Sequence, residues 1–257
     1  MIVAVSTLIR ESGHPIVGGW LGTSSPLVIE ACRAAGLDFV TLDTQHGALS
    51  LEDCAALLAR QAQEDFSVIV RVDSNEPAKI GKALDLGASG VIVPLVETAE
   101  QARSAAQACR FPPLGVRSYG PVRSDIVGMS PAELNDRARL FVMIETEVGM
   151  RNAAEIAATP GVDGIFIGPA DLSISLGLAP QRAFDTAQLE THFRGLRLLA
   201  DRHGLMLGSL GLDVESATRW IEYGCDFVAI VTDERRLIGD AMERLSGDLG
   251  VRSNVEG

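Results

Sequence analysis

The sequence predicts a single-domain α/β protein folded as a (β/α)8 TIM barrel. Short apolar runs rich in Val, Ile and Leu recur between longer segments that have helical spacing and are rich in Ala, Glu and Arg. This alternation is typical of a parallel sheet covered by helices. Eight such runs in a chain of 257 residues fit a closed barrel better than an open, doubly wound sheet.

Each apolar run is expected to form one strand of the barrel. Several runs follow a phrase such as "AAGLDFV", "TPGVDGIFI" or "EYGCDFVAI", in which a glycine ends a helix and a short turn leads into the strand. The eight predicted strands are residues 16–22, 38–44, 67–73, 90–96, 140–146, 163–169, 205–211 and 226–233.

No low-complexity linker divides the chain, so we expect one domain over residues 1–257 with a short N-terminal lead. The longest insertion, residues 111–125, precedes the fifth strand. The last residues, "SNVEG", have the composition of a loose tail.

The composition restricts the partners of the protein. Apolar residues make up 47% of the chain, and acidic residues outnumber basic ones by 34 to 22. The net charge of −12 would repel nucleic acid and anionic lipid. The four cysteines form no CxxC pair, and the chain has neither a signal-peptide pattern nor an apolar run of transmembrane length. We therefore expect a cytoplasmic protein with small-molecule partners and with no nucleic-acid or membrane partner.

Two acidic residues follow neighbouring strands at the barrel end that carries catalytic groups. Glu145 ends the fifth predicted strand and Asp171 follows the sixth. Two hard oxygen ligands on one rim predict a site for Mg²⁺, Mn²⁺ or a similar cation, completed by water and substrate. The alternatives are an N-cap role for Asp171 and a surface ion pair between Glu145 and Arg151.

A histidine and an arginine occupy the ends of two other predicted strands. His46 follows the second strand, where its imidazole could accept a proton; the alternative is a loop histidine satisfied by Asp43. Arg71 ends the third strand, where a guanidinium would meet a substrate carboxylate or enolate. The alternative for Arg71 is an ion pair with Asp73 or another acid of the rim.

The remaining basic residues give weaker indications. The chain has two lysines, Lys79 and Lys82, and both fall in a helical stretch. A Schiff-base mechanism, which needs a desolvated lysine facing the substrate, is therefore disfavoured. Arg117 and Arg123, in the insertion, could meet a second anionic group of a substrate or simply be solvated.

The motifs "GGWLGTSSP", "DTQHG", "VIVRVDSNEPAKIGKALDLGASGVIVPLVETAEQA", "PPLGVRSYGP", "MIETEVGMRN" and "VDGIFIGPADLSISLG" extend over almost the whole chain. Together they resemble the HpcH/HpaI aldolase and citrate lyase family. Within it they are most similar to the class II pyruvate aldolases, which include the 4-hydroxy-2-oxoheptanedioate and 2-keto-3-deoxy sugar acid aldolases.

The resemblance implies a (β/α)8 barrel that cleaves or forms a carbon–carbon bond between pyruvate or hydroxypyruvate and an aldehyde. It implies that Glu145 and Asp171 bind Mg²⁺, Mn²⁺ or Co²⁺ and that Arg71 stabilises the enolate. It further implies that His46 is the proton acceptor and that Asp85 raises its basicity. The oxo-acid pocket implied by the resemblance contains Gly168, Pro169, Ala170, Asp171 and Trp20.

Two departures from the family pattern bear on the substrate. Met143 stands where many members have a glutamine that binds substrate, and Gln45 stands where glutamate is common. These two departures mean that the resemblance does not identify the aldehyde substrate. The family alternative is a CoA-thioester lyase of the malyl-CoA or citryl type, and the alternative outside it is a catalytically silent, metabolite-binding barrel.

The family resemblance also implies a homo-oligomer, typically a hexamer built as a trimer of dimers. The last predicted helix, "RRLIGDAMERLSG", is amphipathic, with Leu237, Ile238, Met242 and Leu245 on one side. It is expected either to pack on a neighbouring subunit or to cover its own barrel.

Overall fold

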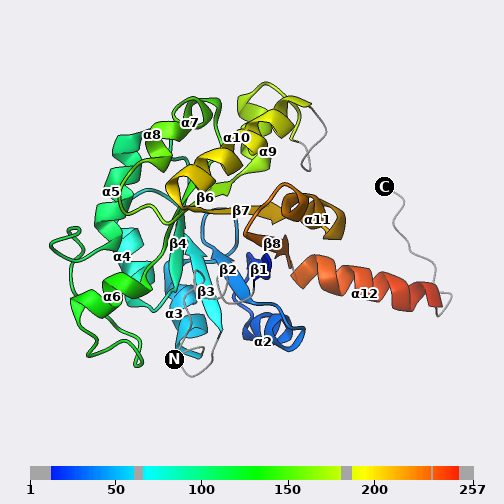
Figure 1. Ribbon diagram of the computed structural model, residues 1–257. Helices are drawn as coiled ribbons and strands as arrows, with labels where there is room; N and C mark the ends of the chain where they lie inside the picture. Colours follow the sequence, from blue (N-terminus) through cyan, green and yellow to red (C-terminus); the bar gives the residue numbers. More distant parts are fainter. Residues whose placement is uncertain (1–12, 61–65, 181–186, 233, 249–257) are drawn as a thin grey trace.

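A computed structural model describes residues 13–60, 66–180, 187–232 and 234–248. Within these ranges, eight parallel strands follow one another in chain order around a closed barrel, and the last pairs with the first. The predicted (β/α)8 fold is confirmed (Figure 1). The strands are β1 (Ile16–Leu21), β2 (Phe39–Asp43), β3 (Ser67–Arg71), β4 (Gly90–Val93), β5 (Leu140–Ile144), β6 (Gly164–Ile167), β7 (Met206–Gly211) and β8 (Phe227–Val231).

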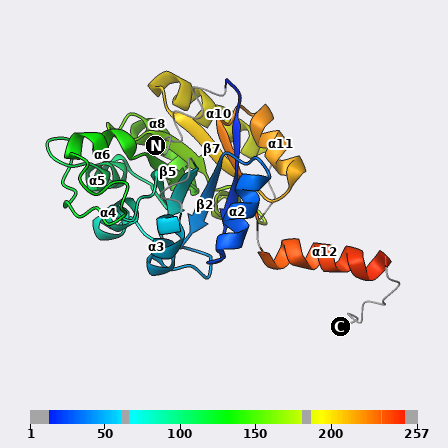
Figure 2. The same cartoon turned by 90° about the horizontal axis from the view of Figure 1, so that it is seen from below.

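Helices alternate with the strands and surround the barrel (Figure 2). None of the described helices is long and apolar enough to cross a membrane. The helices are α2 (Pro26–Ala34), α3 (Leu51–Arg60), α4 (Pro77–Asp85), α5 (Ala99–Cys109), α6 (Pro131–Arg137), α7 (Glu147–Arg151), α8 (Ala153–Ala157), α9 (Pro169–Ser175), α10 (Ala187–His203), α11 (Val214–Glu222) and α12 (Glu234–Asp248).

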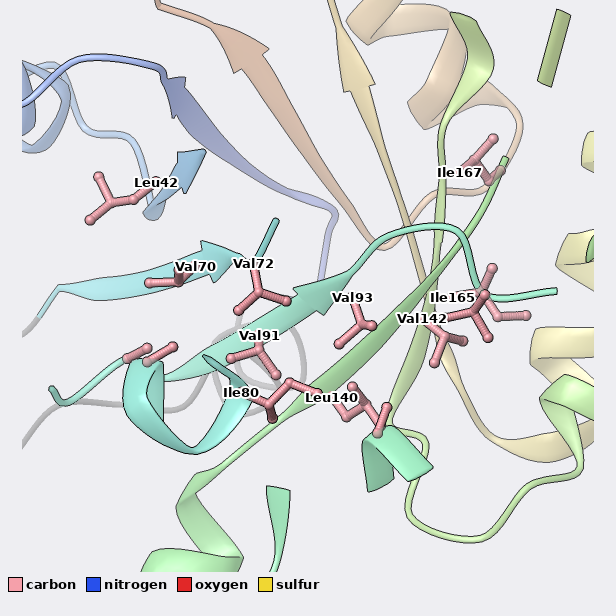
Figure 3. Packing of buried hydrophobic residues seen from close by; sticks show 14 of the residues in the cluster. Leu42, Val70, Val72, Ile80, Val91, Val93, Leu140, Val142, Ile165 and Ile167 are labelled. Atoms are coloured by element: carbon pink, nitrogen blue, oxygen red, sulfur yellow. The ribbon is translucent and has the colours of Figure 1, made fainter. Parts of the chain in front are cut away.

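Alternation along the strands separates two apolar cores. Side chains that point outward meet the helices, as Val91 of β4 does beside Ile80 of α4 (Figure 3). Side chains that point inward fill the barrel with a second cluster, which includes Phe39, Ile69, Phe141, Phe166 and Phe227. Because successive residues of a strand face opposite sides, each strand supplies both cores.

The repeated Gly-x-Asp phrase ahead of three strands has a structural cause. Its glycine has a positive φ of 82°, 89° or 87° at Gly36, Gly161 and Gly224, a conformation that other residues rarely adopt. Gly36 and Gly224 directly follow the C-cap of a helix, and Gly161 lies in the turn between α8 and β6. The aspartate of the phrase then accepts a hydrogen bond from the backbone of the preceding strand and so fixes the register. These bonds join Asp38 to Val17 at 2.9 Å, Asp163 to Leu140 at 2.8 Å and Asp226 to Leu207 at 2.7 Å.

All eight predicted strands extend beyond the observed ones, by one to three residues, and the run at 90–96 shows the cause most clearly. The run at 90–96 was expected to be extended throughout, but β4 ends at Val93. Pro94 has no backbone N–H to continue the ladder, and Leu95 adopts a left-handed conformation with φ of 54°. This turn directs the Leu95 amide at the side chain of Glu145, 2.8 Å away.

The C-terminal helix α12 projects away from the barrel in both views (Figures 1 and 2). Ile238, Met242 and Leu245 are each more than half exposed. The expectation that this helix covers its own barrel is therefore wrong for these three residues. The side chain of Leu237, the N-terminal lead before residue 13, Asp233 and the "SNVEG" end lie outside the described residues.

Candidate active site

A cavity of about 670 Å³ opens at the C-terminal ends of the strands. Most of its lining is apolar or glycine, and its charged and titratable side chains come from four strands or the loops that follow them. These side chains are Asp43, His46, Arg71, Glu145 and Asp171. The cavity therefore brings together the predicted metal ligands, the predicted base and the predicted enolate-binding arginine.

Strand alternation explains why charged side chains enter the barrel. Ile69 and Met143 belong to the inner core, so Arg71 and Glu145, two residues further on, also point inward. Asp43 faces inward for the same reason, four residues after Phe39. These three positions form the top layer of the barrel interior, just above the apolar filling.

Arg71 is held by Asp43, and both are buried, with 6% and 4% of their surface exposed. The Arg71 Nε and Nη2 groups donate to the two Asp43 oxygens at 2.8 and 2.5 Å. Trp20 donates its Nε1–H to the same carboxylate at 3.2 Å, and the guanidinium lies 4.9 Å from the centre of the Trp20 ring. Burial alone would raise the pKa of Asp43, but the hydrogen bonds and charge of Arg71 outweigh it and hold that pKa below its usual value.

The alternative hypothesis for Arg71, an ion pair with an acid of the rim, is thus correct, and the acid is Asp43. The hypothesis is wrong for Asp73, which pairs with Lys79 at 2.8 Å. Asp43 was considered in the sequence only as a partner of the His46 ring. The inward register that it shares with Arg71 on the neighbouring strand is the signal that could have identified the ion pair.

Glu145 is almost completely buried, with 2% of its surface exposed. Burial, followed by the nearby charge of Asp171, raises its pKa to about 7, although the Leu95 amide and Arg71 act in the opposite direction. The surface pair with Arg151 is not formed, because Arg151 pairs with Glu147 at 2.8 Å.

Asp171 lies at the exposed mouth of the cavity, in the first turn of α9. The N-cap of this helix is Gly168, so the N-cap alternative for Asp171 is wrong. Gly168 also permits the close approach of the two acids. A Cβ atom there would lie 2.6 Å from Glu145 Oε2 and 2.7 Å from its Cβ, so a side chain would displace the carboxylate.

The two acids fit a divalent cation in charge and in donor type. Carboxylate oxygens are the ligands that Mg²⁺ and Mn²⁺ prefer. After burial, the negative charge of Asp171 is the next contribution that raises the pKa of Glu145, so the two carboxylates lie close enough to interact. Among the described residues, no group of three or more His, Cys, Asp or Glu side chains is arranged to hold a metal. A cation held by this pair would keep most coordination positions for water and substrate.

His46 is exposed and lines the cavity from the loop after β2. Asp43 Oδ1 accepts hydrogen bonds from the backbone amides of Gln45 at 3.0 Å and His46 at 3.3 Å. Asp43 therefore anchors the backbone of this loop as well as Arg71. The alternative, a His46 ring satisfied by Asp43, is wrong, because Asp43 bonds to the backbone amide of His46 and not to its imidazole.

The structure does not bring Asp85 beside His46 within the described chain. Asp85 ends α4, lines a separate cavity and pairs with Arg117 at 2.6 Å. Arg123 pairs with Asp125 through two bonds of 2.5 and 2.7 Å. Both arginines are buried and neither lines the candidate site, so the expectations of solvation or substrate contact are wrong for Arg117 and Arg123.

The predicted pocket residues all line the same cavity. Trp20 forms a wall, and Pro169 and Ala170 begin α9 next to Asp171. Met143 lies in the floor and has 2% of its surface exposed, so an apolar side chain replaces a hydrogen-bonding one there. Gln45 does not line the cavity, and its side-chain oxygen is buried without a hydrogen-bond partner among the described residues.

Comparison with known proteins identifies the family of the chain. The family model described as HpcH/HpaI aldolase/citrate lyase matches residues 17–239. A hydroxypyruvate/pyruvate aldolase from Deinococcus radiodurans is 36% identical over 95% of this chain and 89% of its own length. A 4-hydroxy-2-oxo-heptane-1,7-dioate aldolase from Salmonella paratyphi C is 33% identical over 96% of this chain and 95% of its own.

A solved structure shows the same arrangement of the chain. The crystal structure of an HpcH/HpaI aldolase from Desulfitobacterium hafniense superposes with a TM-score of 0.85 at 25% identity, covering 98% of this chain and 99% of that one. The chain therefore belongs to the HpcH/HpaI aldolase/citrate lyase family.

Proposed function

We propose that this protein is a class II aldolase that reversibly joins pyruvate or hydroxypyruvate to an aldehyde and depends on a divalent cation. The observation that carries the proposal is the pairing of Glu145 with Asp171 in the cavity that His46 and Arg71 also face. The names of the two similar aldolases support the reaction class. A CoA-thioester lyase is less favoured, because neither relative carries such a name.

In this proposal Glu145 and Asp171 hold Mg²⁺, Mn²⁺ or Co²⁺. The cation, when bound, supplies Lewis-acid polarisation of the 2-oxo group. The first amides of α9, at Ala170 and Asp171, have no helical partner and donate to the substrate carboxylate. Trp20 closes the pocket on the side of β1.

Arg71 and His46 act on the two ends of the bond that breaks. Asp43 occupies Nε and one N–H of Nη2, so the remaining N–H groups of the Arg71 guanidinium can donate to the enolate oxygen. His46 accepts the proton of the 4-hydroxyl group during cleavage and returns it to the aldehyde oxygen during addition. Arg71 ends a strand, and the loop that carries His46 is anchored to Asp43 at the end of the neighbouring strand, so their positions are set before the substrate arrives.

We further propose that the protein is a homo-oligomer, a hexamer in the family arrangement, in which α12 packs on a neighbouring subunit. The support is the apolar stripe of Ile238, Met242 and Leu245 on a helix that projects from its own barrel. Three apolar side chains more than half exposed on one helix are typical of an interaction surface.

The test of the aldolase proposal compares two neighbouring acids. Glu145→Gln keeps the shape of the side chain but removes the charge, and it should lower aldol cleavage at least about 100-fold and weaken Mn²⁺ binding in a direct titration. Glu147→Gln alters an exposed acid that pairs with Arg151 outside the cavity, and it should leave both unchanged. Full turnover by Glu145→Gln would exclude the proposed metal site.

A further inference from the structure

The charged side chains in the described lining of the active-site cavity all lie on one side of the barrel. They come from β2, β3, β5 and β6 or from the loops that follow these strands. The strands β7, β8 and β1 are neighbours in the barrel and form the opposite arc. Among the described residues, every side chain from that arc that lines the cavity is uncharged, so the described lining has a charged half and an uncharged half.

The uncharged half is mainly apolar. The apolar side chains that line it are Trp20, Leu210, Leu212 and Val231. Ser216 also lines it, but its hydroxyl donates to Asp213 at 2.7 Å and accepts the Leu212 amide at 3.0 Å within the cap of α11. The other polar side chain of this half is Thr23, in the loop after β1, and its hydroxyl carries no charge. This arc therefore offers mainly contact to hydrocarbon, and no counter-ion for a charged group among the described residues.

The charged half has no spare cation for a second substrate carboxylate. Arg71 is the one permanently cationic side chain among the described residues that line the cavity, and Asp43 already engages it. A divalent cation at Glu145 and Asp171 would bring the fixed charges of this half to neutrality. The carboxylate of the 2-oxo acid then adds one negative charge, and a further carboxylate would lack a counter-ion.

We propose that the aldehyde used by this protein is uncharged and carries an apolar chain, and that Leu210, Leu212 and Val231 select it against aldehydes that carry a carboxylate. This assignment rests on the proposed function and names the second substrate of the same site. The aldehyde carbon meets the enolate in the charged half, and its chain extends along the arc of β7 and β8. A carboxylate at the end of that chain would lose water without gaining a partner.

The first experiment measures addition of pyruvate to a matched pair of aldehydes, 4-oxobutanoate and its methyl ester. We expect kcat/KM to be about tenfold or more higher for the ester, because only the free acid brings a carboxylate to the uncharged half. An equal or higher value for the free acid would overturn the assignment. Absence of turnover with any aldehyde would instead overturn the proposed function, and the assignment with it.

A second measurement reports binding without turnover. The acids 2-oxoheptanoate and 2-oxoheptanedioate lack the 4-hydroxyl group and cannot be cleaved, and they differ only in the terminal carboxylate. Calorimetric titration of the Mn²⁺-loaded protein should give tighter binding of the monocarboxylate by about tenfold or more. Tighter or equal binding of the dicarboxylate would contradict the proposal.

Variants of one residue test the role of the arc. Leu212→Arg places a cation in the half-buried lining, and it should reduce or reverse the preference for the uncharged ligand. Leu212→Gln loses the same apolar contact but adds no charge, and it should lower the preference less than Leu212→Arg and not reverse it. Leu198→Arg makes the same charge change on the exposed face of α10, outside the cavity, and should behave as the unmodified protein. An equal effect of both arginine variants would overturn the role of Leu212.

Discussion

Asp43 is the residue on which the geometry of the site depends most. Its carboxylate accepts two hydrogen bonds from Arg71, one from Trp20 and two from the backbone of Gln45 and His46. One buried side chain thus orients the arginine proposed for the enolate and anchors the loop that carries the proposed base. Asp43 contacts these groups rather than the substrate, so its role is positioning.

Asp43→Asn should disturb both the position of the Arg71 guanidinium and the loop that carries His46. The amide can accept from Arg71 through one oxygen only, and it leaves a buried guanidinium without its counter-charge, a change that costs about 3–5 kcal/mol of folding stability. We expect kcat to fall about 100-fold or more, measured together with urea unfolding. Asp73→Asn, which alters an exposed acid paired with Lys79, is the matched control and should have little effect. Equal losses in the two variants would contradict the positioning role.

The raised pKa of Glu145 predicts that the folding stability of the cation-free protein decreases as the pH rises through about 7. The pKa of Glu145 is about 7 in the folded chain against a usual value of 4.5, so the folded state holds a proton that the unfolded state has already lost. Stability from this group is therefore present below about pH 4.5 and is lost as the pH rises through about 7. The loss is of the order of 3 kcal/mol.

The measurement is urea unfolding of chelated protein at several pH values between 5 and 8. The difference in unfolding free energy between the unmodified chain and Glu145→Gln should shift in favour of the variant as the pH rises, because glutamine does not ionise. A difference that stays constant over this range would show that the Glu145 pKa is not raised.

At the scale of elements, the turn from β6 into α9 brings the second acid to the first. Gly168→Ala should displace the Glu145 carboxylate, because the added Cβ would meet its oxygen at 2.6 Å. We expect Mn²⁺ affinity to fall at least about tenfold while circular dichroism still shows a folded barrel. Gly195→Ala on α10, where an added Cβ meets nothing within 4 Å, is the control and should bind Mn²⁺ normally. Unchanged affinity in Gly168→Ala would contradict the tight packing at this turn.

The elements also show which features the sequence could predict. Periodicity located all eight strands because buried parallel strands are short, continuous apolar runs bounded by helix ends. The end of β4 was missed because it depends on the absent N–H of Pro94 and the left-handed Leu95, which hydrophobicity does not report. Arg117 and Arg123 were misjudged because their partners, Asp85 and Asp125, are set by the tertiary path of a loop.

The sequence could predict those residues of the site that lie at the end of a strand or directly after it. Glu145, Asp171, Arg71 and His46 follow strands and were found in one cavity. A pair between Arg71 and an acid of the rim was an alternative in the sequence analysis, but Asp43 was not singled out as that acid, since this requires the register of two neighbouring strands.

At the scale of the whole molecule, α12 projects from the described barrel with Ile238, Met242 and Leu245 exposed. Met242→Asp places a charge in the exposed apolar stripe, and it should reduce the mass of the assembly measured by sedimentation equilibrium without unfolding the barrel. Leu198→Asp, on the equally exposed face of α10, is the matched control and should keep the mass of the unmodified protein. An unchanged mass for Met242→Asp would show that α12 is not an interface.

The barrel also holds the side chains of the candidate site in fixed positions. Strands fix Arg71 and Glu145, a short helix presents Asp171, and a loop tied to Asp43 carries His46. The central claim is that a cation held by Glu145 and Asp171 makes the carbon–carbon chemistry possible.

The most direct measurement of that claim is the rate of aldol addition by pyruvate after exhaustive chelation and after readdition of Mg²⁺, Mn²⁺ or Co²⁺. The predicted result is loss of activity on chelation and its return with at least one of these cations, in the unmodified chain but not in Glu145→Gln. Full activity in verified metal-free protein would contradict the account.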